Sequence, residues 1–226
     1  GRKRRKGVHS CGDDLPLAGE RCAYTRRLRS PADHPDVYAV DFYGDSGLGY
    51  GDSALLAFTV DGGATWRVHH GVPAARIRTL AVHASRVLAS DGRTSWVSID
   101  GGDTFHSLPI PATLGPIRDS HVAADGSMFL TGDRGTVLKA THDLSSWIPL
   151  SVGGDVSASI TGIHDVASVI YVSDAQGRLY RSADAGATWD PVPGTGSGTV
   201  LALTGQGNEV LGIVRDSARG AAQLVR

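Results

Sequence analysis

The chain has 226 residues, of which 41% are hydrophobic, and this length and composition fit a single domain with a sizeable core. Its charge is unevenly distributed: residues 1–29 carry nine Lys/Arg and three Asp/Glu, a net +6, and residues 30–226 carry thirteen and twenty, a net −7. Because phosphate backbones need a cationic surface, the acidic body is not expected to bind nucleic acid. No apolar run reaches the roughly 18 residues of a membrane-spanning helix.

The two cysteines belong to the N-terminal part of the chain, where residues 1–21 form a basic arm. The arm opens with Gly-Arg-Lys-Arg-Arg-Lys, which we interpret as a solvated terminus, with steering toward anionic surfaces as the alternative. Cys11 and Cys22 are close in sequence and lie outside the repeated part of the chain, so we predict one local disulfide in an exported protein that is periplasmic, extracellular or surface-associated. Two free thiols are the alternative.

A short segment of the form Ser/Thr-x-Asp-x-Gly-x-Thr-aromatic recurs in the rest of the chain. Three copies match in full, at residues 59–66, 98–105 and 182–189, and a copy at residues 141–147 is one residue shorter. The aspartates of successive copies lie 39, 43 and 41 residues apart, and a period of roughly 40 residues indicates a repeat architecture. The residues that define the copies are Asp61, Gly63, Trp66, Asp100, Gly102, Phe105, Asp143, Trp147, Asp184, Gly186 and Trp189.

This composition predicts a tight turn between two antiparallel strands. The aspartate accepts hydrogen bonds from backbone N–H groups a few residues on, and Gly adopts a positive φ without steric cost. The aromatic residue begins the next strand and fills space between neighbouring sheets. We therefore assign the four aspartates a structural role.

The repeated segment resembles the Asp-box, or BNR repeat, which marks β-propellers of several families: sialidases, sortilin-type receptors, some glycoside hydrolases and photosystem II assembly factors. The resemblance covers about residues 37–226. It implies an all-β fold in residues 22–226, a β-propeller of four-stranded antiparallel blades. It also implies that the repeated turns lie away from any active centre, so it indicates the fold more strongly than the function.

Each repeat is predicted to form one blade of four short strands. The predicted blades span about residues 37–73, 74–111, 112–152 and 153–197, and a fifth spans residues 198–226. In the first blade a Gly-rich stretch, residues 44–52, occupies the place of the second strand, so we expect a loop there that could wrap a ligand. The loop lacks the ligand spacing of a calcium site, and the histidines lack zinc spacing, so we expect neither a metal nor another cofactor.

The fifth blade lacks its outer strand, because the chain stops at Arg226, where the repeated turn would begin. We predict that residues 22–29, chiefly 22–28, supply this strand and close a ring of five blades, since a closed ring leaves no open sheet edge. The alternative is that the chain is part of a propeller with six or seven blades.

The loops between the second and third strands share an unusual composition, because each contains an Asp and an Arg with a Gly close by. Turns need Asp and Gly but do not need Arg, whose guanidinium makes bidentate contacts with carboxylate or phosphate. We therefore predict that these loops bind a protein or another polar or acidic ligand, with simple turn chemistry and weak local ion pairs as the alternative. The predicted residues are Asp91, Arg93, Asp133, Arg134, Asp174, Arg178, Asp216 and Arg219.

Two functions are compatible with these patterns. The first is a monomeric, non-catalytic interaction or assembly module that binds a partner through one face. The alternative is a glycan-active protein, either a lectin-like binder or a hydrolase related to sialidases. Sialidases carry Arg-Ile-Pro near their start, whereas this chain has only the reverse order, Pro116-Ile117-Arg118, and no spacing singles out a pair of catalytic aspartates. We therefore predict no catalytic residues.

Overall fold

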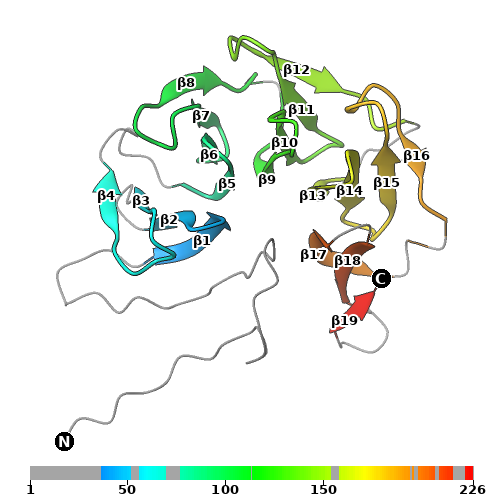
Figure 1. Ribbon diagram of the computed structural model, residues 1–226. Helices are drawn as coiled ribbons and strands as arrows, with labels where there is room; N and C mark the ends of the chain where they lie inside the picture. The colour runs from blue at the N-terminus through cyan, green and yellow to red at the C-terminus, as the bar shows by residue number, and fades with distance from the viewer. Residues whose placement is uncertain are drawn as a thin grey trace, which may run out of the picture. The chain divides into compact units, whose positions relative to one another are not determined.

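The computed structural model describes residues 37–51, 56–69, 77–112, 114–153, 158–193, 195, 198–206, 209–215 and 222–225. Within these ranges every regular element is a β-strand, and the strands pair in antiparallel sheets of four or three (Figure 1). The predicted fold class, all-β with four-stranded antiparallel sheets, is confirmed. The chain divides into two compact units, Gly1–Arg76 and Ile77–Arg226.

The first unit contains one sheet of four strands in chain order: β1 (Val37–Tyr43), β2 (Ser46–Gly51), β3 (Leu56–Thr59) and β4 (Arg67–His69). The loop expected at residues 44–52 is therefore wrong, since most of this stretch is strand β2. Gly44, at φ 59°, and Asp45 form a two-residue turn, so Tyr43 pairs with Ser46. Because β2 pairs with β1 on one edge and β3 on the other, its backbone hydrogen bonds compensate for the weak strand preference of glycine.

The second unit contains three further sheets of four strands, and each of them again follows the chain order. The strands are β5 (Thr79–His83), β6 (Arg86–Ser90), β7 (Thr94–Ser98) and β8 (His106–Pro109); β9 (Ile117–Val122), β10 (Met128–Gly132), β11 (Val137–Ala140) and β12 (Trp147–Leu150); β13 (Ile160–Val166), β14 (Val169–Asp174), β15 (Leu179–Ser182) and β16 (Asp190–Pro191).

The last described sheet has three strands, β17 (Thr199–Gln206), β18 (Glu209–Arg215) and β19 (Ala222–Val225). The first strands of successive sheets contact one another, β5 with β9, β9 with β13 and β13 with β17. The predicted fourth strand at residues 22–29 and the predicted disulfide between Cys11 and Cys22 lie outside the described residues.

The core of the second unit lies between neighbouring sheets. Side chains alternate along a strand, so one face of a sheet packs against the preceding sheet and the other face against the next sheet. Leu130 and Trp147, from the sheet β9–β12, share a cluster with Leu88 and Val97 of the sheet β5–β8. Phe129, the neighbour of Leu130, instead joins a cluster with residues of the sheet β13–β16. This packing of sheet against sheet fixes the loops of successive sheets side by side.

The repeated turn has the same hydrogen bonds in each complete copy. In the first copy Thr59 Oγ1 donates to Asp61 Oδ1 (2.7 Å), and Gly63 N–H donates to Thr59 Oγ1 (3.0 Å). Thr65 donates to the same carboxylate through its N–H (2.9 Å) and its hydroxyl (2.6 Å). The copies at residues 98–105 and 182–189 repeat these bonds.

These bonds to the ionised carboxylate change its acidity. Hydrogen bonds from Thr65 and Thr59 lower the pKa of Asp61 to about 2, and those from Thr188 and Ser182 lower the pKa of Asp184 to about 2. The pKa of Asp100 is lowered in the same way. Each aspartate therefore works as an ionised acceptor that closes a turn.

Candidate functional site

Antiparallel strand order places the loops predicted to bind a partner at the same edge of their sheets as the starts of the first strands. Backbone hydrogen bonds tie the first two of these loops to the segment that begins the following sheet: Ile117 N–H donates to Gly92 O (3.2 Å), and Gly135 N–H donates to Ala158 O (2.8 Å). We call this edge of the second unit the arginine edge, and define it by residues 78, 91–93, 117–118, 133–135, 158–159 and 174–178.

The aspartates of this edge close turns. Asp91 Oδ1 accepts the N–H groups of Arg93 (2.8 Å) and Thr94 (2.7 Å). Asp174, which is fully buried, accepts the N–H groups of Gln176 and Arg178, both at 2.9 Å, through Oδ1. These contacts are the turn chemistry that the sequence predicts for Asp.

Arg178 is held by its own loop. Its Nε donates to Asp174 Oδ2 (2.6 Å), and its Nη2 donates to Gln176 Oε1 (2.7 Å). The hydrogen bond to Asp174 raises the pKa of the guanidinium, which also lies 5.9 Å from the centroid of the Tyr180 ring. The side chain remains 43% exposed, so the group is oriented but still accessible.

Arg118 belongs to the same edge, although the sequence did not identify it. It is the second residue of β9, and its Nε donates to Asp133 Oδ1. The same oxygen accepts the hydroxyl of Ser159, from the next sheet, at 2.7 Å. The hydrogen bonds from Arg118 and Ser159 lower the pKa of Asp133, so this carboxylate stays ionised between the two sheets. The sequence offers only the signal of a charged Arg next to the apolar Ile117.

Arg93 and Arg134 are exposed in their loops, and within the described part of the chain neither guanidinium makes a hydrogen bond or an ion pair. Arg134 has a φ of 57°, in the left-handed region that side chains rarely adopt. The structure thus brings together six of the eight predicted residues, with the addition of Arg118. The remaining two, Asp216 and Arg219, lie outside the described residues.

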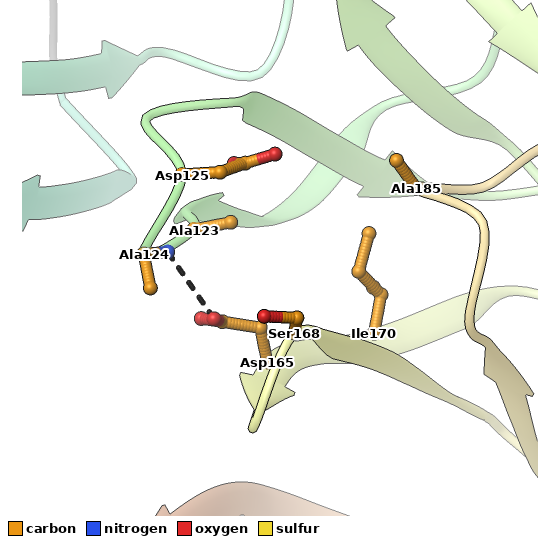
Figure 2. A pocket seen from close by; sticks show the side chains of 7 residues that line it. All are labelled: Ala123, Ala124, Asp125, Asp165, Ser168, Ile170 and Ala185. Carbon is orange, nitrogen blue, oxygen red and sulfur yellow. Dashed lines mark hydrogen bonds between the residues drawn. The ribbon is translucent and has the colours of Figure 1, made fainter.

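The opposite edge of the second unit carries a small hollow between the turn that follows β9 and the turn that follows β13 (Figure 2). Asp165 lies there with Oδ1 at 2.6 Å from His121 Nε2, and its Oδ2 accepts Ala124 N–H at 3.1 Å. Burial alone would raise the pKa of Asp165, but the hydrogen bonds from His121 and Ala124 outweigh burial and lower this pKa to about 2. The hollow is lined by Ala123, Ala124, Asp125, Asp165, Ser168, Ile170 and Ala185.

The carboxyl groups bear on the alternative of a glycoside hydrolase. Such an enzyme needs one carboxylic acid whose pKa is raised, so that it still carries a proton to donate. Among the described residues, the carboxyl groups with a clearly shifted pKa are all shifted downward. They are Asp61, Asp100, Asp133, Asp143, Asp165 and Asp184.

In the part of the chain that the structure describes, no group of three or more His, Cys, Asp or Glu residues is placed to hold a metal ion. The same part contains no helix that is long and apolar enough to cross a membrane.

No family model matches this chain. A curated relative, a xyloglucanase of Hypocrea jecorina (strain QM6a), is 24% identical over 204 residues, which are 76% of this chain and 23% of the xyloglucanase. The chain therefore spans less than a quarter of the length of that relative.

Solved structures resemble the chain more completely. YCF48 bound to D1 peptide has a TM-score of 0.65 at 16% identity, with 82% of this chain and 62% of that chain covered. The β-propeller domain of Cps50 (Swd1) from Myceliophteria thermophila has a TM-score of 0.60 at 14% identity, covering 80% and 63%. A virginiamycin B lyase from Staphylococcus aureus has a TM-score of 0.65 at 10% identity, covering 86% and 71%. At these identities the likeness concerns the fold alone, and that fold is a β-propeller.

Proposed function

We propose that this chain is a non-catalytic β-propeller interaction module that binds an acidic segment of a partner protein through the arginine edge. The observation that carries the proposal is the supply of accessible guanidinium groups on that edge. Arg93, Arg118 and Arg134 are exposed and Arg178 is partly exposed, whereas the aspartates beside them are engaged in turns or ion pairs. Guanidinium groups pair with carboxylates through two parallel hydrogen bonds, so acidic side chains are the matching ligands.

The backbone conformation of Arg134 belongs to a tight turn, in which Thr136 N–H donates to Asp133 O at 3.2 Å and both Arg134 and Gly135 have positive φ. The φ of 57° at Arg134 costs a side chain about 1 kcal/mol, which a glycine at the same place would not incur. Strained positions are enriched at binding sites, but Ala84, Ala167 and Ala185 in this chain also have positive φ, so the strain is compatible with the proposal and does not carry it. Among the described residues the Arg134 guanidinium makes no ion pair or hydrogen bond, and its charge contributes to lowering the pKa of Asp133.

The wider features of the chain agree with this proposal. We take the repeated turns to be Asp-boxes, because three of them share one set of hydrogen bonds and recur at a nearly constant spacing. A solved propeller of similar fold, YCF48, is bound to a peptide. We further propose that the protein is exported and monomeric, in keeping with Cys11 and Cys22 as a local disulfide pair.

The proposal is tested with a fluorescent peptide of alternating Gly and Asp and a matched peptide of Gly and Asn. We expect the acidic peptide to raise the fluorescence anisotropy on titration with the full chain, and the neutral peptide to leave it unchanged. The double variant Arg93→Ala, Arg134→Gly should weaken binding by on the order of 10-fold, and added salt should weaken it further. Arg181→Ala is the matched control, since Arg181 is exposed on β15, away from the arginine edge.

Absence of binding to the acidic peptide would contradict the proposal. Equal binding of both peptides would contradict it as well, and so would a loss of affinity in Arg181→Ala equal to that in the double variant.

A glycan-active protein is the second candidate, and the match to a xyloglucanase is the observation that favours it. Under this reading the chain releases reducing sugar from xyloglucan, or binds xyloglucan without cleaving it. A reducing-sugar assay and an affinity gel with immobilised xyloglucan separate the two. Release of reducing sugar or retention on the gel would replace the first proposal. If the chain shows neither activity nor retention, the first proposal stands.

A further inference from the structure

We propose that Arg118 is the oriented carboxylate anchor of the arginine edge, and that Asp133 is the residue that positions it. This inference rests on the proposed function and names the group that recognises the acidic side chain. It concerns a residue pair that the composition of the loops does not reveal.

The geometry of the contact leaves the binding edge of the guanidinium free. Asp133 engages only Nε of Arg118, and within the described residues no other hydrogen bond of this guanidinium is present. The two terminal amino groups of an arginine lie in one plane and match the two oxygens of a carboxylate. Since the Arg118 side chain is 51% exposed, an incoming carboxylate can reach these groups from solvent.

Asp133 is itself held from two sides. Its Oδ1 accepts the Ser159 hydroxyl at 2.7 Å, its N–H donates to Pro116 O at 3.2 Å, and Gly132, the residue before it, lies against the backbone of Pro116 and Ile117. The carboxylate is 23% exposed, so it is more fixed than the arginine that it orients. Arg118 is therefore presented in one orientation by two neighbouring sheets, and an oriented group loses less conformational freedom when a ligand binds.

Orientation and net charge predict opposite results when the charge of Asp133 is removed. If the edge attracts acidic peptides by charge alone, Asp133→Asn adds one positive charge and binding becomes tighter. If Asp133 positions Arg118, the same substitution loosens the guanidinium and binding becomes weaker. Asp125→Asn is the matched control, because it adds the same charge away from the arginine edge, and Asp125 accepts hydrogen bonds from Ser127 in its own turn rather than from a guanidinium.

The experiment measures the anisotropy of the Gly/Asp peptide with the full chain and four variants. We expect Asp125→Asn to bind as tightly as the unaltered chain or slightly tighter, and Asp133→Asn to bind about 10-fold more weakly, the loss associated with one charge-assisted hydrogen bond. Arg118→Lys keeps the charge but lacks the planar pair of donors, so we expect a similar loss. Ser159→Ala removes one of the bonds that hold Asp133, and we expect a loss of about 3-fold.

Tighter or unchanged binding by Asp133→Asn would overturn the inference and leave the proposed function standing. Arg118→Lys that binds as well as the unaltered chain would overturn it too, and this variant keeps the Asp133 carboxylate, so it serves if Asp133→Asn does not fold. Failure of the unaltered chain to bind the acidic peptide would overturn the proposed function instead.

Discussion

The indole N–H of Trp147 donates to Ser95 Oγ of the preceding sheet, at 3.1 Å, and so links two sheets of the second unit. The equivalent residues Trp66 and Trp189 donate within their own turns, to Gly63 O and Gly186 O, each at 3.1 Å. The difference follows from the shortened turn at residues 141–147, which lacks the glycine that supplies this acceptor. One missing residue thus converts a local bond into a bond between sheets.

We expect Trp147→Phe to lower the free energy of unfolding of the second unit. The loss should be about 1–2 kcal/mol larger than the loss that Trp66→Phe causes in the first sheet. The reason is that Trp147 is buried, and its loss removes a buried hydrogen bond together with packing area. Urea unfolding followed by fluorescence and circular dichroism measures the change. Equal effects of the two substitutions would show that the bond to Ser95 contributes nothing.

Ala185→Gly should stabilise the protein by about 1 kcal/mol, because Ala185 has a φ of 56° where the matching turns have Gly62 and Gly101. The control is Ala187→Gly in the same turn, where no positive φ exists to relieve, and glycine only adds freedom to the unfolded chain. Thermal unfolding compares the two variants. A lower midpoint for Ala185→Gly than for the unaltered chain would contradict the strain at this position.

Gly177→Ala should destabilise the second unit by about 3 kcal/mol or more, because a Cβ at this residue would lie 1.7 Å from Gly198 O. Gly101→Ala is the control, since Gly101 has a similar φ of 79° but nothing within 4 Å of the added atom. Gly101→Ala therefore measures the cost of backbone strain alone, roughly 1 kcal/mol. Unfolding free energies that do not differ between the two would show that the loop after β14 does not pack closely on the start of β17.

The repeated turns predict a loss of stability in acid. The pKa of Asp184 is about 2 in the folded chain and its ordinary value is 3.8, so ionisation of Asp184 stabilises the fold above its ordinary pKa. This contribution is lost as the pH falls through about 2. The unfolding free energy of the unaltered chain should therefore converge on that of Asp184→Asn as the solution is acidified. A difference between the two that stays constant from neutral pH to about pH 2 would contradict the shifted pKa.

Most strands could be predicted from the sequence because the repeated turn marks the same point in each sheet. Asp100, Asp143 and Asp184 each lie between the third and fourth strands of a sheet of the second unit. The exception is β2, where the glycines between Gly44 and Gly51 have weak intrinsic strand preference. Pairing with β1 and β3 overrides that preference, and pairing is not visible in a local pattern.

The candidate site was predictable only in its loops. The sequence identifies Arg93, Arg134 and Arg178, because each lies next to an Asp and a Gly. It does not identify Arg118, since its partner Asp133 follows 15 residues later and the second contact of that carboxylate, Ser159, comes from another sheet. Contacts of this kind depend on how sheets pack, which single-sequence patterns do not encode.

Binding at the arginine edge is tested most directly by mapping where an acidic peptide contacts the chain. Amide chemical shifts of the labelled chain are recorded during titration with the Gly/Asp peptide. We predict that the largest changes fall at residues 91–94, 117–118, 133–136 and 174–179, on the arginine edge. Changes concentrated at the opposite edge, around residues 124–127 and 167–168, or spread evenly over the chain, would contradict the claim that the arginine edge is the binding surface.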